Sequence, residues 1–286
     1  MELITGIQKA IDYIDTHLLN DLTIDEIAKQ AYVSPFHFQR VFHILSGFTV
    51  SEYIRNRRLS LAAAELQRNV KVVDTAIKYG YNSSESFSRA FERFHGVLPS
   101  MAKNAVIKSF SRLNIKVILE GGSVMDYRFE KMDGIRLLGK AVRDTDGGGN
   151  GALLWKTSHK DGTLKILTEY STSPDKELIG IMDGSAYDPA DSSWLYYVAT
   201  PYNGDAEPEG FVIKEIPART WAKFRCFGMS DRDKDAEIWR KIYSEFLPTS
   251  DYDSDLYAME VYYYDDGNYS DDVAEVWIDV KKKAVK

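Results

Sequence analysis

Two stretches of the chain carry the same pattern: Ser34-Pro-Phe-His-Phe-Gln-Arg-Val-Phe-His-Ile-Leu-Ser-Gly47 and Ser83-Ser-Glu-Ser-Phe-Ser-Arg-Ala-Phe-Glu-Arg-Phe-His-Gly96. Four residues of the first stretch recur 49 positions later in the second, where Phe38, Arg40, Phe42 and Gly47 become Phe87, Arg89, Phe91 and Gly96. In both stretches apolar residues fall at i, i+3, i+4 and i+7. This spacing predicts two amphipathic helices.

A shorter helix is predicted before each of the two. Thr23-Ile-Asp-Glu26 has the form of a capping box, in which a hydroxyl and a carboxylate satisfy free backbone N–H groups at a helix start. Ser34 then caps the next helix, and Pro35 occupies its first position. A helix, a tight turn and a second helix form a helix-turn-helix, whose second or recognition helix enters the DNA major groove. The repeat therefore predicts two such units.

The two units are predicted to be joined by one continuous helix, Val50–Gln67, which contains no helix breaker. A helix of this length spans about 27 Å, and successive major-groove segments on one side of B-DNA lie about 34 Å apart. A rigid connector of this size can place both recognition helices on one side of a duplex. Arg55, Arg57 and Arg58 near its start either contact phosphates or form a solvated basic face.

The faces opposite the apolar stripes carry side chains that can contact bases: Phe36, Gln39, Arg40 and His43 on the first helix, and Glu85, Ser88 and Arg89 on the second. Phe36 can instead be a core aromatic. Glu85 can accept a hydrogen bond from cytosine or simply favour the helix N-terminus. His37 and His43 are expected at the surface or facing phosphates, because no Cys or second His has metal-ligand spacing to them.

Length and composition limit the class of protein. At 286 residues the chain predicts about two domains. Its one cysteine, Cys226, excludes an internal disulfide and a multi-cysteine metal site, and it fits a reducing compartment. The sequence shows neither a secretory signal pattern nor an apolar run of membrane-spanning length. We therefore expect a cytoplasmic protein with no membrane partner and predict no cofactor or metal.

The net charge of −7 conceals an asymmetry between the two halves. Residues 1–112 hold 14 basic and 11 acidic side chains, a net +3, whereas residues 113–286 hold 22 and 32, a net −10. Within residues 34–112 the net charge is +7. Basic charge is thus concentrated where a phosphate backbone would bind, and the acidic half is expected to have another role.

The first half resembles the AraC/XylS transcription regulators over about residues 1–105. The resemblance rests on the following residues: Arg58, Leu59, Ala62, Asp74, Ala76, Gly80, Tyr81, Phe87, Ser88, Arg89, Phe91, Gly96, Pro99 and Ser100. It implies a monomeric double helix-turn-helix that binds promoter DNA. The positions that it assigns to base contacts are Phe36, Gln39 and Arg40 on the first recognition helix, and Glu85, Ser86, Ser88 and Arg89 on the second. Ala102 departs from the pattern, because an aromatic residue usually stands there.

The second half is predicted to begin after a linker, residues 111–124, that ends in Gly121-Gly-Ser123. Strands are predicted on both sides of Asp133-Gly134, and Gly147–Gly151 is predicted as a flexible loop before a helix near 152–159. Two further strands near 178–182 and 194–199 complete the unit. The same order then recurs, with 212–217 and 220–226 predicted as paired strands. Met132 with Ile216 and Trp155 with Trp239 share an offset of 84. We expect two β-β-α-β-β repeats, with their helices on one face of a sheet and a pseudo-twofold cleft.

Aromatic residues dominate this half: all five tryptophans and 13 of the 18 tyrosines lie beyond Gly122. An apolar cleft of this kind with a carboxylate inside suits cationic, amphipathic small molecules. The sequence from Ile216-Pro-Ala218 through Met259-Glu-Val-Tyr262 to Glu275-Val-Trp-Ile278 resembles the GyrI-like (SOUL/SHS2-type) effector-binding domain over roughly 125–284.

This second resemblance places Glu260 in the effector pocket, where the family's glutamate meets ligand cations. Trp221, Tyr243, Tyr197 and Tyr262 are further pocket candidates, and an exposed strand carboxylate is the alternative for Glu260. Strand alternation predicts that Glu260 shares a face with Tyr262 and not with Met259.

The sequence therefore predicts a multidomain protein. An all-α double helix-turn-helix DNA-binding domain (1–110) precedes the linker (111–124) and an α+β GyrI-like domain of two β-β-α-β-β repeats (125–286). The hypothesis is a non-enzymatic, one-component transcription regulator whose partners are double-stranded promoter DNA, RNA polymerase and a small, hydrophobic, cationic effector. The alternatives are that the second half hydrolyses a small molecule, with Glu260 activating water, or that it is only a protein-interaction module.

Overall fold

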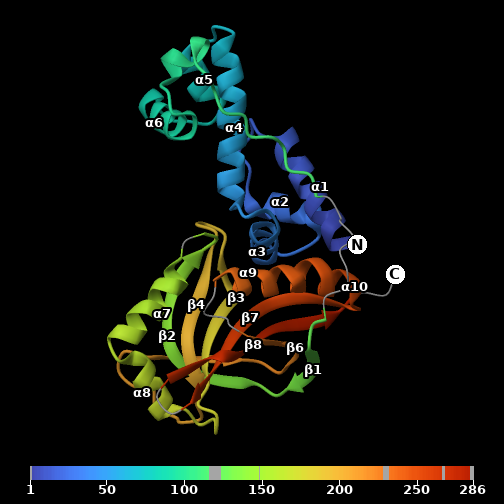
Figure 1. Ribbon diagram of the computed structural model, residues 1–286, viewed down its shortest axis with the longest axis vertical. Coiled ribbons are helices and arrows are strands. Elements are labelled where there is room, and N and C mark those ends of the chain that lie inside the picture. The colour runs from blue at the N-terminus through green and yellow to red at the C-terminus, as the bar shows by residue number, and fades with distance from the viewer. Residues whose placement is uncertain (1, 116–123, 148, 228–231, 266–267, 284–286) are drawn as a thin grey trace. The chain divides into compact units, whose positions relative to one another are not determined.

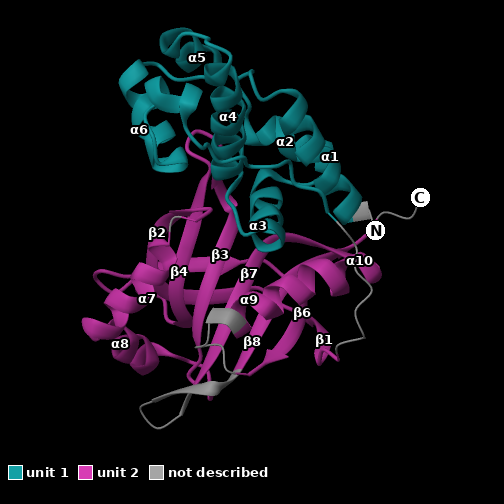
Figure 2. Cartoon of the chain, turned by 45° about the horizontal axis from the view of Figure 1, so that its top comes forward, with its two compact units in different colours: residues 1–117 teal, residues 118–286 magenta. Residues whose placement is uncertain are grey.

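The computed structural model describes residues 2–115, 124–147, 149–227, 232–265 and 268–283. The chain divides into two compact units, Met1–Val117 and Ile118–Lys286 (Figure 2), so the division falls within the predicted linker. The predicted hinge at 121–123 lies outside the described residues. Among the described helices, none is long and apolar enough to cross a bilayer.

The secondary structure of the first unit is all helical up to residue 104, as predicted. Its elements are α1 (Glu2–Thr16), α2 (Ile24–Ala31), α3 (Pro35–Ser46), α4 (Val50–Gln67), α5 (Val72–Lys78), α6 (Ser84–His95) and the 3₁₀ helix η1 (Pro99–Asn104). Helices α2 and α3 form the first helix-turn-helix and α5 and α6 the second, with α4 as the continuous helix between them (Figure 1).

The two recognition helices, α3 and α6, begin and end in the same way. The hydroxyls of Ser34 and Ser83 accept hydrogen bonds from the backbone N–H three residues further on, at 3.2 and 3.1 Å. Gly47 and Gly96 end the helices in the left-handed region, with φ of 73° and 81°. A side chain at either glycine would strain the backbone. The repeated sequence thus specifies repeated helix boundaries as well as repeated apolar faces.

After the second helix-turn-helix, an extended segment, residues 105–115, runs back along α4. We call this segment the strap. Its Phe110 N–H donates to Ser60 Oγ at 3.0 Å, and the Phe110 carbonyl accepts from Arg57 Nη1 at 2.6 Å. The Leu113 N–H donates to the Tyr53 hydroxyl at 3.3 Å. The strap therefore fastens the chain beyond the second helix-turn-helix back onto the first half of α4.

The second unit is an eight-stranded antiparallel sheet with helices. Its elements are β1 (Tyr127–Met132), β2 (Ile135–Thr145), α7 (Asn150–Lys160), α8 (Thr163–Tyr170), β3 (Leu178–Asp188), β4 (Ser193–Pro201), β5 (Val212–Ile216), β6 (Arg219–Cys226), α9 (Arg232–Lys241), the π-helix η2 (Ile242–Phe246), α10 (Leu247–Thr249), β7 (Tyr252–Asp265) and β8 (Asn268–Lys282). The predicted β-β-α-β-β order is confirmed in both repeats, with α8 as an additional helix in the first. The predicted loop at 147–151 ends earlier than expected, because Asn150 and Gly151 already belong to α7.

The predicted pairing of β5 with β6 is wrong, and β1 and β2, the strands on both sides of Asp133-Gly134, do not pair with each other either. The strand order is β1-β6-β8-β7-β3-β4-β2-β5, so each repeat gives its first strand to the other repeat. A two-residue hairpin needs a positive φ in its turn, and neither Asp133-Gly134 nor Pro217-Ala218 has one. The two connections lie close together, because a Cβ on Gly134 would lie 3.2 Å from the carbonyl oxygen of Ile216.

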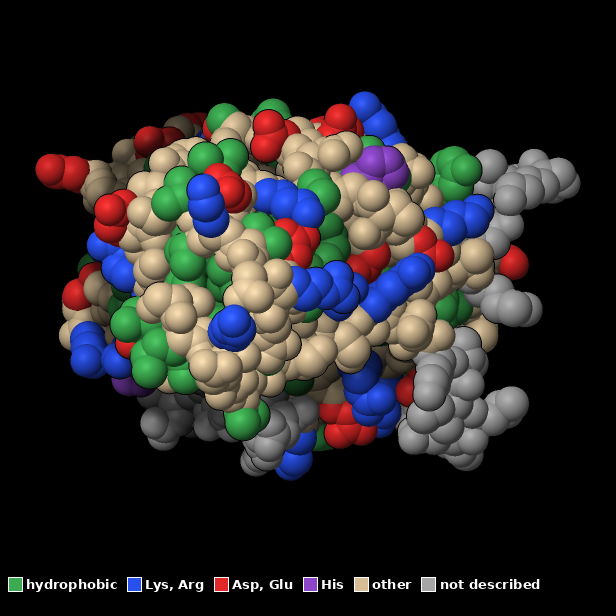
Figure 3. All heavy atoms as spheres, turned by 90° about the horizontal axis from the view of Figure 1, so that it is seen from above, with side chains coloured by type: hydrophobic (Ala, Val, Ile, Leu, Met, Phe, Trp, Pro, Cys, Tyr) green, Lys and Arg blue, Asp and Glu red, His purple; other side chains and the backbone are tan. Residues whose placement is uncertain are grey.

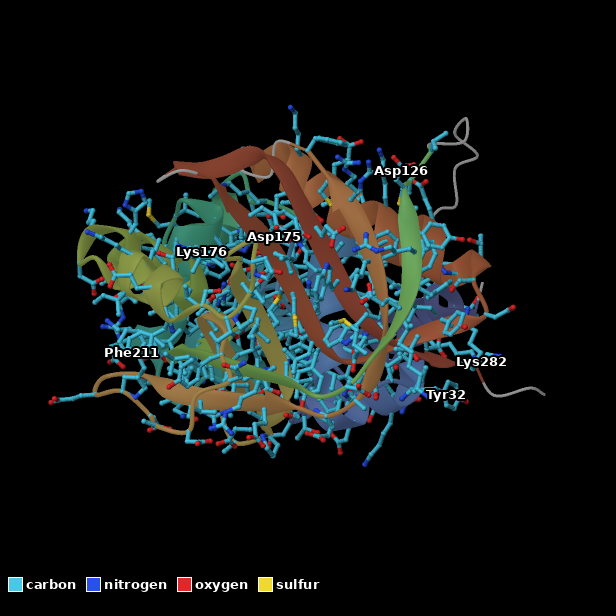
Figure 4. The ribbon with its side chains drawn as sticks, turned by 90° about the horizontal axis from the view of Figure 1, so that it is seen from below. Tyr32, Asp126, Asp175, Lys176, Phe211 and Lys282 are labelled. Carbon is cyan, nitrogen blue, oxygen red and sulfur yellow. The ribbon has the colours of Figure 1, made fainter. Side chains whose placement is uncertain are left out.

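The strand order reads the same from both ends once the repeats are exchanged, so the sheet has the predicted pseudo-twofold symmetry. The central pair is β3 with β7, and the edges are β1 and β5. Figure 4 labels Asp126, just before β1, and Phe211, just before β5. The sheet centre is therefore built from equivalent strands of the two repeats.

The helices lie on one face of the sheet, as predicted. Residues paired across neighbouring strands point to the same face. Glu260 pairs with Gly180, and Gly180 pairs with Val198, which belongs to the core beneath α7 and α8. Trp239 of α9 also contacts Glu260. The other face carries a separate core that includes Ile181, Tyr197, Trp221, Met259 and Trp277.

Candidate functional site

Helix α6 presents most of its predicted DNA contacts to solvent. Glu85 and Arg89 are exposed and Ser88 is half-buried, whereas Phe87 and Phe91 are fully buried. The Ser86 hydroxyl is already engaged at the start of the helix, because it donates a hydrogen bond to the Ser83 carbonyl at 2.9 Å. In this structure α6 can therefore offer a carboxylate, a hydroxyl and a guanidinium to a duplex. Figure 3 shows one face of the molecule, on which Lys and Arg side chains are interspersed with acidic ones.

Helix α3 differs from α6. Phe36, Gln39 and Arg40 are only 4%, 5% and 8% exposed, and the Gln39 Nε2 is buried with no hydrogen-bond partner among the described residues. These side chains are therefore buried in this structure, and their contact with DNA stays a prediction. Helical periodicity predicted one buried stripe, but α3 buries every residue from 36 to 42. Leaving an amide unpaired costs about 1–3 kcal/mol.

The three arginines near the start of α4 have different roles. Arg57 Nε donates to Asp15 at 2.7 Å, and Arg58 donates to the carbonyls of Leu18 and Asn20 at 2.7 and 2.8 Å. These two guanidinium groups hold the loop after α1 and the helix itself in place. Arg55 alone is exposed, and no ion pair or hydrogen bond to it occurs within the described residues.

In the second unit Glu260 lies on β7, one of the two central strands, and its side chain is partly buried. Trp239 Nε1 of α9 donates to Glu260 Oε1 at 3.2 Å, and the Tyr262 hydroxyl donates to Oε2 at 3.3 Å. Burial, followed by the negative charge of Glu260, raises the pKa of Tyr262 above its ordinary value. The phenol therefore stays a neutral donor at physiological pH. Trp239 and Tyr262 are thus uncharged aromatic donors to this carboxylate.

Aromatic rings from the first repeat complete this site. Trp155 of α7 lies edge-on to Tyr262, with ring centroids 5.3 Å apart, and its Nε1 donates to the Tyr196 hydroxyl at 2.7 Å. Gly180, the partner of Glu260 in the sheet, leaves room for these rings, because a Cβ there would overlap with the Tyr196 hydroxyl. The Glu260 site thus combines one carboxylate with Trp239, Tyr262, Trp155 and Tyr196.

Tyr243 also belongs to this side of the sheet. Its ring stacks on Trp239 at 6.4 Å with an interplanar angle of 24°, and it is buried within the π-helical turn Ile242–Phe246. Single π-helical turns inside helices occur frequently at functional sites. The turn places Tyr243 behind Trp239, so it supports the indole that contacts the carboxylate.

Tyr197 and Trp221, the other two predicted pocket residues, lie on the opposite face of the sheet. Tyr197 pairs with Ile181, which pairs with Met259. Because neighbours along a strand point to opposite faces, Tyr197 shares a face with Met259 and not with Glu260. Trp221 packs in the same core as Met259. Both are therefore corrected to core residues, since their position depended on strand pairings that the sequence did not reveal.

Trp239, Trp155 and Tyr196 were not among the predicted site residues. The offset of 84 between the two tryptophans already showed that both repeats place an indole at the same point of their helix. The pseudo-twofold axis then brings the two indoles to neighbouring positions over the central strands. Tyr196 had no comparable signal, because only the register of β4 shows which face it occupies.

The site's chemistry suits recognition of a cation that bears apolar groups. Glu260 supplies the charge, the aromatic faces supply dispersion and cation–π attraction, and the two neutral donors hold the carboxylate in place. A positively charged ligand group could replace these hydrogen-bond donors at the Glu260 carboxylate and form an ion pair with it.

Two domain models match the chain. Residues 27–105 match a helix-turn-helix domain, and residues 125–281 match a GyrI-like small molecule binding domain. The second match spans more than half of the sequence.

Similar proteins are found for each half. The regulatory protein SoxS of Salmonella typhimurium is 42% identical over 95 residues, covering 33% of this chain and 89% of that protein. The transcriptional activator AarP of Providencia stuartii is 40% identical over 96 residues, covering 33% and 71%. A putative transcription regulation protein of Staphylococcus aureus Mu50 has a solved structure that covers 55% of this chain and 99% of its own, with 16% identity and a TM-score of 0.44.

Proposed function

The chain belongs to the AraC family of helix-turn-helix transcriptional regulators and carries a GyrI-like small molecule binding domain, and on this premise we propose that a lipophilic cation bound at Glu260 controls its binding to promoter DNA. The observation that carries the proposal is the position of Glu260, a partly buried carboxylate at the sheet centre that accepts hydrogen bonds from the aromatic side chains of Trp239 and Tyr262.

The effector class follows from the surroundings of Glu260. A hydrophilic cation would gain the ion pair but lose its hydration against aromatic walls, whereas a cation with aryl or alkyl groups gains from both. An anion would be repelled by the negative charge of Glu260. We therefore expect monovalent, apolar cations to bind and neutral analogues of the same shape to bind more weakly.

The DNA contacts of this proposal differ between the two recognition helices. Arg89 and Glu85 on α6 are exposed and Ser88 is half-buried, which supports base contacts by this helix without rearrangement. Phe36, Gln39 and Arg40 on α3 need a rearrangement that exposes them first. A conformation in which both recognition helices are exposed would bind two major-groove segments, whereas one in which α3 is buried would bind through α6. We propose that the effector shifts the balance between such states, and that recruitment of RNA polymerase is the output. The relative AarP is named as a transcriptional activator, which supports a positive output.

The effector half of the proposal is tested by calorimetric titration of the full chain with tetraphenylphosphonium. We expect Glu260→Gln to weaken binding at least tenfold, because it removes the charge but keeps the shape. Glu237→Gln is the matched control, since Glu237 is an exposed carboxylate on α9 that pairs with Lys241. Equal affinity of the wild type and Glu260→Gln would contradict the proposal.

The DNA half is tested by footprinting at the protein's own promoter. Arg89→Ala is expected to cost about 1–3 kcal/mol of specific binding, the range of one good base contact. Lys165→Ala, an exposed basic residue on α8, is the control for net charge. Adding tetraphenylphosphonium should change the footprint of the wild type but not that of Glu260→Gln.

A further inference from the structure

The first unit contains a pocket of about 370 Å³ where its two helix-turn-helix units meet. Three separate segments supply the walls: the loop between α1 and α2, the first half of α4, and the turn between α5 and α6. The lining residues are Asp21, Leu22, Ser51, Ile54, Arg55, Arg58, Tyr79, Gly80 and Tyr81. A ligand in this pocket would touch both helix-turn-helix units and α4, the helix that joins them.

One stripe of α4 forms the floor of the pocket. Ser51, Ile54, Arg55 and Arg58 follow the spacing i, i+3, i+4 and i+7, so they lie on one face of the helix. Tyr53, by contrast, contacts the strap through its hydroxyl. The face of α4 that carries the pocket is therefore distinct from the face that carries the strap.

Arg58 gives the pocket a fixed positive charge. Its Nε and Nη2 donate to the carbonyls of Leu18 and Asn20, which leaves Nη1 on the side of Gly80. A Cβ on Gly80 would lie 2.9 Å from that nitrogen, and Gly80 has a φ of +80°. The guanidinium is thus held by the loop before the first helix-turn-helix and packs against the turn of the second helix-turn-helix.

Three further donors line the pocket: Arg55, Ser51 and Tyr81. Arg55 and Ser51 are exposed, and within the described residues no hydrogen bond joins either side chain, or the Tyr81 hydroxyl, to another group. The Tyr81 ring is fixed edge-on to Phe87, with centroids 5.2 Å apart. Burial raises the pKa of Tyr81, and the cations of Arg55 and Arg58 oppose this shift. The phenol therefore remains a protonated donor close to both guanidinium groups.

We propose that this pocket is an oxyanion site that takes a phosphate group. Two arginines and two hydroxyl-bearing residues line it, and charged donors bind phosphate oxygens strongly. Asp21 is the one acidic side chain of the lining, so the two arginines and this carboxylate give a net charge of +1. The phosphate comes either from the backbone of bound DNA or from a free phosphate or phosphomonoester. The DNA alternative rests on the proposed function.

The full-length protein and three variants distinguish these sources. Arg55→Gln and Tyr81→Phe each remove one donor, and Asp21→Asn removes the opposing charge. Arg68→Gln and Asp25→Asn are the matched controls outside the pocket. For each protein, the line broadening of inorganic phosphate in ³¹P spectra is measured without DNA. The dependence of promoter affinity on salt concentration is measured separately.

If the phosphate belongs to the DNA backbone, Arg55→Gln should reduce the steepness with which the logarithm of promoter affinity falls with the logarithm of salt concentration. The expected reduction is about 0.9, the value for one phosphate, and Arg68→Gln should reduce it less. A free-anion source predicts instead that the line broadening falls at least fivefold in Arg55→Gln and Tyr81→Phe and rises in Asp21→Asn. If both measurements match the controls, the pocket is not an oxyanion site. A wild type that binds phosphate but no DNA would refute the proposed function and leave this site standing.

Discussion

The indole N–H of Trp239 donates a 3.2 Å hydrogen bond to Glu260 Oε1, which connects helix α9 to the centre of the sheet. This contact uses the same carboxylate that the proposed cation would bind. In the proposed function, binding would exchange a neutral donor for a charged one and change what holds α9 at this point.

Trp239→Phe should separate the two roles of this indole, because it keeps an aromatic ring and removes the donor. We expect it to destabilise the second unit by about 1–3 kcal/mol and to strengthen tetraphenylphosphonium binding, since the cation no longer competes with the N–H. Urea unfolding followed by tryptophan fluorescence and calorimetric titration measure the two effects. Trp155→Phe is the control, because its N–H serves Tyr196. Tighter binding in both variants would argue against competition at Glu260.

Gly180→Ala is expected to destabilise the second unit by about 1–3 kcal/mol, the usual cost of overpacking. The added methyl group would overlap with the Tyr196 hydroxyl and lie 3.2 Å from Trp155 Nε1. Tyr196→Phe removes that oxygen, so the double variant should lose less stability than the two single changes added together. Denaturant midpoints of the four proteins give this coupling. Strict additivity would show that the clash is relieved elsewhere.

Asp279 should make stability depend on pH in an unusual direction. Burial raises its pKa to about 6, although it accepts from the Tyr257 N–H at 2.9 Å and pairs with Arg219 at 2.8 Å. Asp255 also faces it, through the shared Arg219. Because the folded state binds this proton more tightly than the unfolded state, the Asp279 contribution falls as pH rises from about 4 to 6 and is constant above that. The full effect is about 3 kcal/mol.

The difference in free energy of unfolding between the wild type and Asp279→Asn isolates this group, since the paired carboxylates with lowered pKa values, such as Glu275, contribute equally to both. The wild type should lose stability relative to Asp279→Asn between pH 4.5 and 6.5. A difference independent of pH across this window would mean that Asp279 is ionised throughout.

Tyr53→Phe tests the strap. The Tyr53 hydroxyl donates to Asp15 and accepts from the Leu113 N–H at 3.3 Å, while Arg57 pairs with Asp15 at 2.7 Å. Removing the hydroxyl should cost about 1–3 kcal/mol and speed amide hydrogen exchange at Leu113. Exchange followed by mass spectrometry or NMR reports it. Tyr13→Phe is the control, because the Tyr13 hydroxyl makes no hydrogen bond within the described residues. Unchanged protection at Leu113 would show that the strap is held by its other contacts.

Local features of the sequence predicted much of this molecule. The capping residues Ser34 and Ser83 and the glycines that end α3 and α6 lie within a few residues of what they control, so the helix boundaries followed from the chain alone. Strand alternation likewise placed Glu260 and Tyr262 on one face. The offset of 84 between Trp155 and Trp239 predicted the repeat and its symmetry.

The errors concern contacts between residues far apart in the chain. Tyr197 and Trp221 were assigned to the pocket, but they lie on the other face of the sheet. The assignment depended on strand partners, and β1 and β5 exchange partners between the repeats because neither connection adopts a hairpin turn. Gln39 is a further example, because its position on a helix was predicted but its burial, which depends on residues distant in the chain, was not.

By itself, the sequence determined the helices, the strands, their repeats and the two units, because periodicity, caps and glycines act on the backbone within one or two turns. Only the tertiary structure decided which strands are neighbours, which aromatic residues join Glu260, and that Arg57 and Arg58 brace the first unit while Arg55 stays exposed. Those outcomes depend on the register and packing of segments tens of residues apart, and no local pattern encodes them.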